Sequence, residues 1–200
     1  MLKILVVCFS LIAILQNPLV LAAGNQTQQM VKCAPQLQSC FKTIQKLPEV
    51  KRLIEDIQKE GSIGIAINNH PLSQQFGAFW DPDRRMIFVS PSTHNSEGQT
   101  IGSILFELQN AFVSSKINHL DSLASQGKID KEKYVEAMER LEYHNSKNAS
   151  KLAEKGIKLG IFPAAARLHT YRDFEEHYRI QKMAGHSAWI AKNYDSLAPR

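Results

Sequence analysis

The sequence lacks the patterns that identify several large classes of protein. It has no glycine period, no sustained heptad, no internal repeat and only one long apolar run. These absences exclude collagen-like, coiled-coil-only and multi-span membrane proteins. Glycine-rich nucleotide-binding patterns are missing as well. Basic residues are scattered, without a long run or interleaved aromatic residues, so the sequence predicts no nucleic-acid partner.

What the sequence does contain is enough for one folded domain. The chain has 200 residues, of which 44% are hydrophobic, and its formal net charge is +5. This length suits about one domain, and this composition supports a hydrophobic core.

The first 23 residues have the composition of an export signal. Eighteen of the 23 are apolar, Lys3 supplies a basic start, and Pro18 interrupts the apolar run before small residues lead to Ala23. This order is typical of a secretory signal peptide, and the apolar run is too short for a membrane anchor. We therefore expect residues 1–23 to be removed, leaving one α+β domain at 24–200 whose start, 24–35, is flexible. The mature protein is expected to be secreted or periplasmic, with no membrane span.

Cysteine is scarce, with three residues in the chain. Removal of the signal peptide takes Cys8 and leaves Cys33 and Cys40, an even number in an oxidising compartment. Their spacing differs from the C-x-x-C spacing of redox sites. The sequence therefore predicts a structural disulfide between Cys33 and Cys40.

The hydrophobic periodicity changes twice along the chain. Helical spacing covers 36–47 and 48–61, a period of two covers three short segments at 63–67, 78–80 and 85–90, and helical spacing then returns. The later helices are expected at 99–125, 130–156, 170–184 and 187–197. This segregation predicts an α+β fold with two N-terminal helices, a small three-stranded antiparallel sheet and a bundle of about four helices.

The segment Phe106-Glu107-Leu108-Gln109-Asn110 resembles the H-E-x-x-H helix of zincin metallopeptidases. In that family two histidines on one helix face hold zinc, and the glutamate acts as general base. Glu107 keeps the glutamate position, whereas Phe106 and Asn110 stand where the zinc ligands would be. The resemblance implies a zincin-like scaffold without zinc, in which the next helix, carrying Glu139 and Glu142, occupies the place of the third ligand.

Helix geometry gives an independent observation about the same segment. At 100° per residue, Ser103, Glu107, Asn110 and Ser114 fall within a stripe of about 60° beside the apolar face. Three interpretations stay open at this point. The stripe is the solvated side of an amphipathic helix, or it faces a cleft with the Glu139 and Glu142 helix, or it is a buried polar network that fixes helix packing.

The seven histidines form no compact metal-binding pattern. There is no H-x-H, no E-x-x-H and no i,i+4 histidine pair, so the sequence predicts neither a metal nor another cofactor. We interpret His177 and His186 as residues near helix ends that complement the helix dipole. His144 follows Glu142 closely in the sequence and is a further candidate for the site.

Three functions remain compatible with the sequence. The first is a protein of zincin-like scaffold without zinc ligands that acts as a binding protein or degenerate enzyme, with a macromolecule or small ligand outside the cytoplasm as its partner. The loss of both histidine positions favours this function. The second is a metal-independent hydrolase that uses Glu107 as general base, with Asn110 and one of Glu139, Glu142 or His144 completing the site. The third is a helical interaction module with no active cleft. The surroundings of the Glu107 side chain distinguish the first two from the third.

Overall fold

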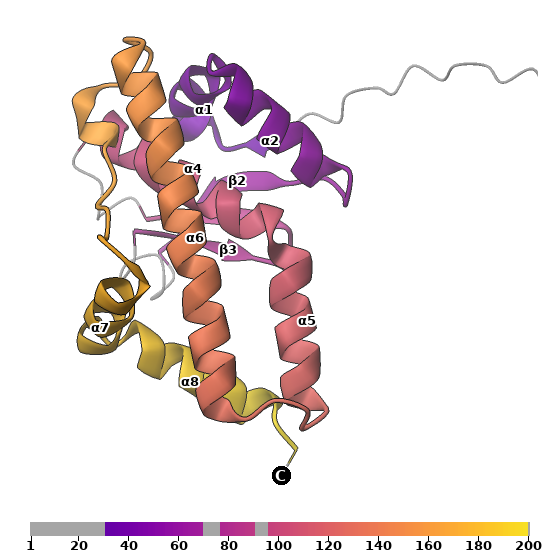
Figure 1. The fold of residues 1–200 in the computed structure, drawn as a ribbon. Helices are drawn as coiled ribbons and strands as arrows, with labels where there is room; N and C mark the ends of the chain where they lie inside the picture. Colours follow the sequence, from indigo (N-terminus) through magenta and orange to yellow (C-terminus); the bar gives the residue numbers. More distant parts are fainter. Residues whose placement is uncertain (1–30, 70–76, 91–95, 200) are drawn as a thin grey trace, which may run out of the picture.

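A computed structural model describes residues 31–69, 77–90 and 96–199 (Figure 1). The expected signal peptide at 1–23 lies outside these residues. The described elements, in chain order, are β1 (Lys32–Cys33), η1 (Pro35–Leu37), α1 (Gln38–Gln45), α2 (Pro48–Gln58), β2 (Gly64–Ile67), β3 (Ala78–Asp81), β4 (Met86–Val89), α4 (Glu97–Phe112), α5 (Ser114–Ser125), α6 (Lys131–Lys158), η2 (Ala164–Ala166), α7 (Phe174–Ala184) and α8 (His186–Leu197). The predicted α+β class and helical second half are confirmed.

The sheet differs from the predicted three-stranded antiparallel arrangement. It has four strands in the order β1-β2-β4-β3, and β1 with β2 and β2 with β4 are parallel pairs. Only β3 and β4 form the expected antiparallel pair. The parallel register places Ile65 opposite Ile87, and both side chains are buried. Strand β1 was not expected, because residues 24–35 were assigned to a flexible segment.

Helix α4 lies at the centre of the molecule. Ser96 caps its N-terminus, where the Oγ accepts a hydrogen bond from the backbone N–H of Gln99. The helix contacts the sheet, α1, α2, α6 and η2. Gly98 and Gly102 let η2 approach closely, since a Cβ on Gly98 would lie 2.8 Å from backbone atoms of that segment. A helix covered on so many sides also buries polar side chains that a surface helix would expose.

The predicted continuous helix at 99–125 is two helices. The break lies at Val113, where φ is −98° and ψ is 13°, next to the polar stretch that begins at Ser114. Trp80 of β3 donates a hydrogen bond from Nε1 to Ser114 Oγ at 3.2 Å. This hydrogen bond connects the start of α5 to β3, the strand at the edge of the sheet.

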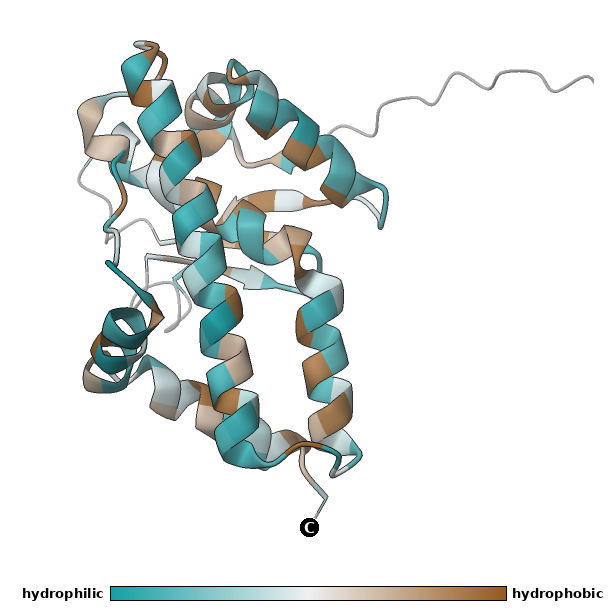
Figure 2. Cartoon of the chain, in the orientation of Figure 1, coloured by the Kyte–Doolittle hydropathy of each residue, from teal (hydrophilic) through white to brown (hydrophobic). Residues whose placement is uncertain are grey.

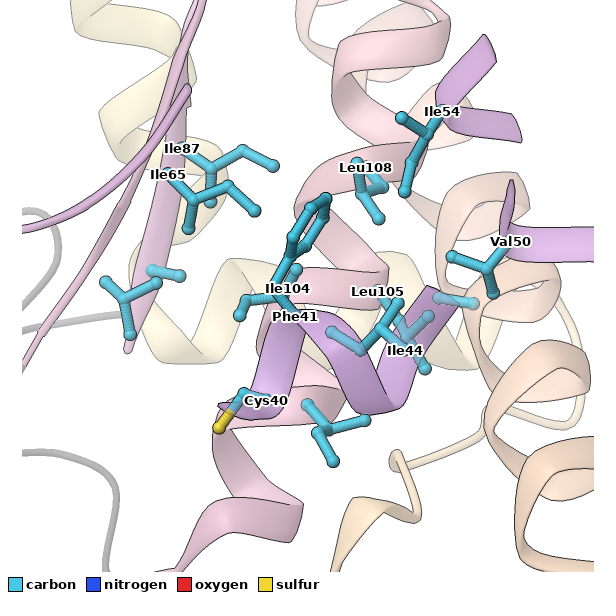
Figure 3. Packing of buried hydrophobic residues seen from close by; sticks show 14 of the residues in the cluster. Cys40, Phe41, Ile44, Val50, Ile54, Ile65, Ile87, Ile104, Leu105 and Leu108 are labelled. Atoms are coloured by element: carbon cyan, nitrogen blue, oxygen red, sulfur yellow. The ribbon is translucent and has the colours of Figure 1, made fainter. Parts of the chain in front are cut away.

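The main hydrophobic core joins α1, α2, the sheet and α4. Figure 3 shows their side chains turned toward one another, with Phe41 of α1 in the middle of the group. A second cluster, built around Tyr134 and Ile190, joins α5, α6 and α8 at the other end of the long helix α6 (Figure 1). Helix α6 therefore connects both packed regions, while much of its surface in the view of Figure 2 is hydrophilic. None of the described helices is long and apolar enough to cross a membrane.

The two cysteines do not form the predicted disulfide in the structure. Both are free thiols: Cys33 lies on β1, where its Sγ donates to the Ala34 carbonyl oxygen at 3.6 Å, and Cys40 packs into the core (Figure 3). Counting cysteines gives the number available for pairing but does not show where their side chains point. Here the Cys33 thiol contacts the neighbouring backbone, and the Cys40 thiol packs in the main hydrophobic core.

Both thiols are expected to react slowly in the folded protein. Burial, with a contribution from the charge on Cys40, raises the pKa of Cys33 to about 11. Burial and the nearby Glu97 likewise raise the pKa of Cys40. Because the thiolate is the reactive form, alkylation of Cys33 at pH 8 should be about 100-fold slower in the native protein than after unfolding, and alkylation of Cys40 should be slower as well. Peptide mass spectrometry without reduction should find both cysteines alkylated after unfolding, and an intact Cys33–Cys40 disulfide peptide would contradict this prediction.

Candidate functional site

The Glu107 side chain is buried in the middle of α4, with 5% of its surface exposed. Its Oε2 accepts a hydrogen bond from Asn110 Nδ2 at 3.0 Å, one helical turn away, and its carboxylate also accepts one from the backbone N–H of Trp80. Ser114, at the end of the same stripe, is buried too. The interpretation of this stripe as the solvated side of a helix is therefore wrong.

A hydrogen-bond chain connects Glu107 to α6. Asn145 Nδ2 donates to Asn110 Oδ1 at 2.8 Å, and Asn110 in turn donates to Glu107. Asn145 was not among the predicted site residues. It follows Glu139 and Glu142 at a spacing of three residues, so the helix period places all three toward the same side of α6.

Burial is the main reason that the pKa of Glu107 is raised, to about 8. The negative charge of Glu142 raises it further, while the hydrogen bonds from Asn110 and Trp80 and the charge of His186 oppose the change. The Glu107 carboxyl is therefore mostly protonated at pH 7 and retains hydrogen-bond donors that stabilise its ionised form. This combination suits a group that gives up and regains a proton.

The pKa of Glu139 is shifted downward, in the opposite direction to that of Glu107, although the Glu139 side chain is fully buried. Its Oε2 accepts a hydrogen bond from His177 Nε2 at 3.0 Å, and its Oε1 interacts with His186 Nδ1 at 3.2 Å and Ser187 Oγ at 2.6 Å. Burial alone would raise the pKa of Glu139, but these three partners outweigh it and hold the pKa at about 2. Glu139 is thus ionised where Glu107 is protonated.

The predicted candidates Glu107, Asn110, Glu139 and Glu142 belong to one electrostatically coupled region, and His144 does not. Glu142 is half-buried, and burial followed by the charge of Glu139 raises its pKa against the opposing charge of His186. His144 is exposed on α6 and contacts the neighbouring Tyr143 ring. His144 therefore faces solvent, and it does not line the cavity next to Glu107.

His177 and His186 do not have the predicted role at helix C-termini. His177 lies in the first half of α7, and His186 is the first residue of α8, where the helix dipole disfavours a cation. Both side chains instead converge on Glu139, which raises the pKa of His186 although burial alone would lower it. The packing of α7 and α8 against α6 brings these residues together.

A cavity of about 200 Å³ adjoins Glu107. It lies between α4, α6, α7 and the segment that precedes α7. One lining residue of that segment, His169, is exposed to solvent. Phe106, which stands at a zinc-ligand position of the zincin motif, forms part of the apolar wall. The lining residues are Ser103, Phe106, Glu107, Ser146, Leu168, His169, Tyr171, His177 and Gln181.

The protein is expected to be independent of zinc. Phe106 has no ligating atom, both polar atoms of the Asn110 side chain are hydrogen-bonded, and no group of three or more His, Cys, Asp or Glu side chains among the described residues is arranged to hold a metal ion. We expect substoichiometric zinc by elemental analysis after dialysis, and the same Tm with and without EDTA, since a metal bound only to the native state would raise Tm. Stoichiometric zinc that survives dialysis would disprove this prediction.

Comparisons with protein families, curated proteins and solved structures find no match to this chain. The resemblance to zincin metallopeptidases therefore rests on the residues of the Glu107 helix, and a zincin-like scaffold stays a proposal.

Proposed function

We propose that this protein is an exported hydrolase that works without a bound metal and that Glu107 is its acid–base group. The observation that carries the proposal is a buried carboxyl group in the wall of a cavity of about 200 Å³, where burial raises its pKa to about 8. A buried ionisable group with a strongly displaced pKa beside a cavity is typical of a functional site.

The protonation state of Glu107 assigns it an acid role at the start of a reaction. A protonated carboxyl can donate to the leaving group or to a carbonyl oxygen of a bound substrate. The carboxylate that results keeps the hydrogen bonds from Asn110 and from the backbone of Trp80. Glu107 can therefore lose its proton without leaving an unpaired buried charge, and it acts as a base only in the second half of a cycle.

The resemblance to zincin metallopeptidases supports this proposal in one respect, the position of the glutamate. In both arrangements a glutamate in the middle of a long helix faces the place where the substrate would lie, and here Phe106 and Asn110 replace the metal ligands. We therefore propose a zincin-like scaffold in which proton transfer by side chains takes the place of metal-activated water. Export to the periplasm or the cell exterior follows from the expected signal peptide at 1–23.

Binding without turnover is the second candidate function. It is favoured by the small volume of the cavity and by its polar lining groups, which include Tyr171 and Gln181 beside the protonated Glu107. Such a lining suits a small uncharged ligand, or an uncharged group at the end of a macromolecule. A ligand that binds but is recovered unchanged would favour this function over hydrolysis.

The hydrolase proposal is tested with nitrophenyl esters, nitrophenyl glycosides and peptide nitroanilides. We expect the native protein to hydrolyse at least one of these classes and Glu107→Gln to lower kcat/KM by about 100-fold or more, because proton transfer by a positioned side chain contributes that much. Glu132→Gln is the matched control, since Glu132 is exposed on α6 and does not line the cavity. Equal activity of Glu107→Gln and native protein, or no turnover of any class, would argue against the proposal.

A further inference from the structure

His177 is a second ionisable side chain in the wall of the Glu107 cavity. Only 1% of the residue is exposed, and its two ring nitrogens differ in their surroundings. Nε2 lies 3.0 Å from Glu139 Oε2, whereas Nδ1 is buried and has no hydrogen-bond partner among the described residues. A buried polar atom without a partner is uncommon in a folded protein and calls for an explanation.

The partner of Nε2 determines which nitrogen of the neutral ring carries the hydrogen. Glu139 is fully buried and also accepts a hydrogen bond from Ser187 Oγ at 2.6 Å, and an ionised carboxylate is an acceptor only. Nε2 must therefore be the N–H donor to Glu139. Nδ1 then carries a lone pair, because an Nδ1–H would be a buried donor with no acceptor.

Three aromatic rings hold the imidazole in this orientation. The ring of Tyr171 meets it edge-on at 4.7 Å between centroids, and the rings of Tyr143 and Phe174 lie at 5.7 and 6.3 Å. The contacts come from α6, from α7 and from the segment before α7. A ring fixed on several sides, with one nitrogen bound to a carboxylate, has the arrangement of a histidine base and its orienting acid.

We propose that His177 is a second catalytic residue, the general base that activates water in the Glu107 cavity, and that Glu139 is its positioning residue. This inference rests on the proposed hydrolase function and adds the residue that accepts a proton while Glu107 donates one. The two groups lie on α7 and α4 and line the same cavity.

The step balances with water as the co-reactant. His177 Nδ1 takes a proton from water as the water oxygen forms a bond to the electrophilic carbon of the substrate. The bond from that carbon to its leaving group breaks, and the leaving group takes the proton of Glu107. The products are the hydroxylated fragment, the protonated leaving group, a carboxylate at Glu107 and an imidazolium at His177 that faces Glu139. Transfer of the extra proton from His177 to Glu107 through solvent restores the starting state.

The protonation pattern can be measured without any substrate. Nitrogen-15 NMR of the imidazole groups in the full-length protein above pH 7 should show His177 with hydrogen on Nε2 and none on Nδ1. His177→Gln assigns the signals, and its amide nitrogen can still donate to Glu139. A signal showing hydrogen on Nδ1 of the neutral ring would overturn the proposal, whatever the activity of the protein.

Kinetics with the chromogenic substrate identified for the native protein provide the second test. We expect His177→Gln to lower kcat/KM at least 100-fold and to remove the acidic limb of its pH profile, which a purely structural role would leave in place. Among the described residues, the ionisable groups around the ring and its cavity are Glu107, Glu139, Glu142, Tyr143, His169, Tyr171 and His186. Glu107→Gln should remove the alkaline limb instead, so the two limbs can be assigned separately. His144→Gln is the matched control, because this exposed histidine on α6 does not line the cavity.

The outcomes separate this inference from the proposed function. A His177→Gln variant with native Tm, near-native kcat/KM and an unchanged acidic limb, beside an inactive Glu107→Gln variant, would overturn the role of His177 and leave the hydrolase proposal intact. No turnover by the native protein on any probe class would overturn the proposed function itself. Loss of activity and of the acidic limb in His177→Gln, with the control unaffected, would support the inference.

Discussion

Replacing Glu139 by glutamine is expected to lower the free energy of unfolding by about 3–5 kcal/mol, the range for breaking a buried, hydrogen-bonded charge pair. The carboxylate accepts hydrogen bonds from donors on both α7 and α8, at His177 and Ser187, and it interacts with His186. A glutamine has one acceptor oxygen, and its NH₂ group would face one of these donors. His186 would also lose the adjacent charge that favours its protonated form.

Urea denaturation at pH 6 measures this effect. Glu136→Gln is the matched control, because Glu136 lies on the same helix and forms a solvent-exposed pair with Arg140 at 2.6 Å. Exposed pairs contribute about 0–1 kcal/mol, so the control should remain close to the native protein. If Glu139→Gln loses no more stability than Glu136→Gln, Glu139 does not hold α7 and α8 against α6.

The acid sensitivity of the fold should follow from the same residue. The pKa of Glu139 is about 2 in the folded protein, against an ordinary value of 4.5. Its contribution to stability is therefore fully present above pH 4.5 and is lost as the pH falls toward 2. The raised pKa of His186 acts in the other direction, since its contribution is present below its ordinary value of 6.5 and is lost as the pH rises through its folded value. The cluster should stabilise the protein most between about pH 4.5 and 6.5.

The sequence predicts the fold class because its periodic segments are short and well separated. The period of two in Ile63, Ile65 and Ile67 corresponds to β2, and the turn at 81–84 produces the antiparallel pair of β3 and β4. Alternation shows which side chains share a face of a strand, but it does not identify the neighbouring strand or its direction. The parallel pairing of β2 with β4 depends on tertiary packing, and it was therefore missed.

For the candidate site as well, the sequence predicts which residues are neighbours on one helix but not which residues meet from different helices. Helical spacing alone places Glu107 beside Asn110, and it places Glu139 and Glu142 on the following helix. Ionic partners on other helices leave no such pattern, so His177, His186 and Ser187 could not be connected to Glu139 from the sequence. One signal was available: His177 lies three residues after Phe174 in α7, and both are buried. A histidine on the apolar face of a helix indicates a buried partner, but it does not say which one.

The buried carboxyl of Glu107 should make the folded protein less stable as the pH rises. Its pKa is about 8 in the folded state and has an ordinary value of 4.5, so the native state binds more protons than the unfolded state between these values. Stability from this group is fully present below pH 4.5 and falls by about 1.4 kcal/mol for each pH unit up to about 8. Glutamine imitates the protonated form at every pH. We therefore expect Glu107→Gln to be more stable than native protein by about 2–4 kcal/mol at pH 8, after allowing for imperfect replacement, and nearly equal to it at pH 5.

Urea denaturation at pH 5, 6, 7 and 8 tests two parts of this expectation: the change in the free energy of unfolding with pH, and the difference in that free energy between the native protein and Glu107→Gln. The native protein should lose stability across the series more steeply than Glu107→Gln, whereas Glu132→Gln, an exposed replacement on α6, should follow the native slope. Glu142→Gln provides a graded variant, because removing its negative charge should lower the pKa of Glu107 and reduce the slope only in part. A gain in stability together with a loss of hydrolysis would mean that the protein retains a destabilising carboxyl for its chemistry. Parallel curves for native protein and Glu107→Gln would show that Glu107 is not protonated at neutral pH, and the acid role proposed for it would then be wrong.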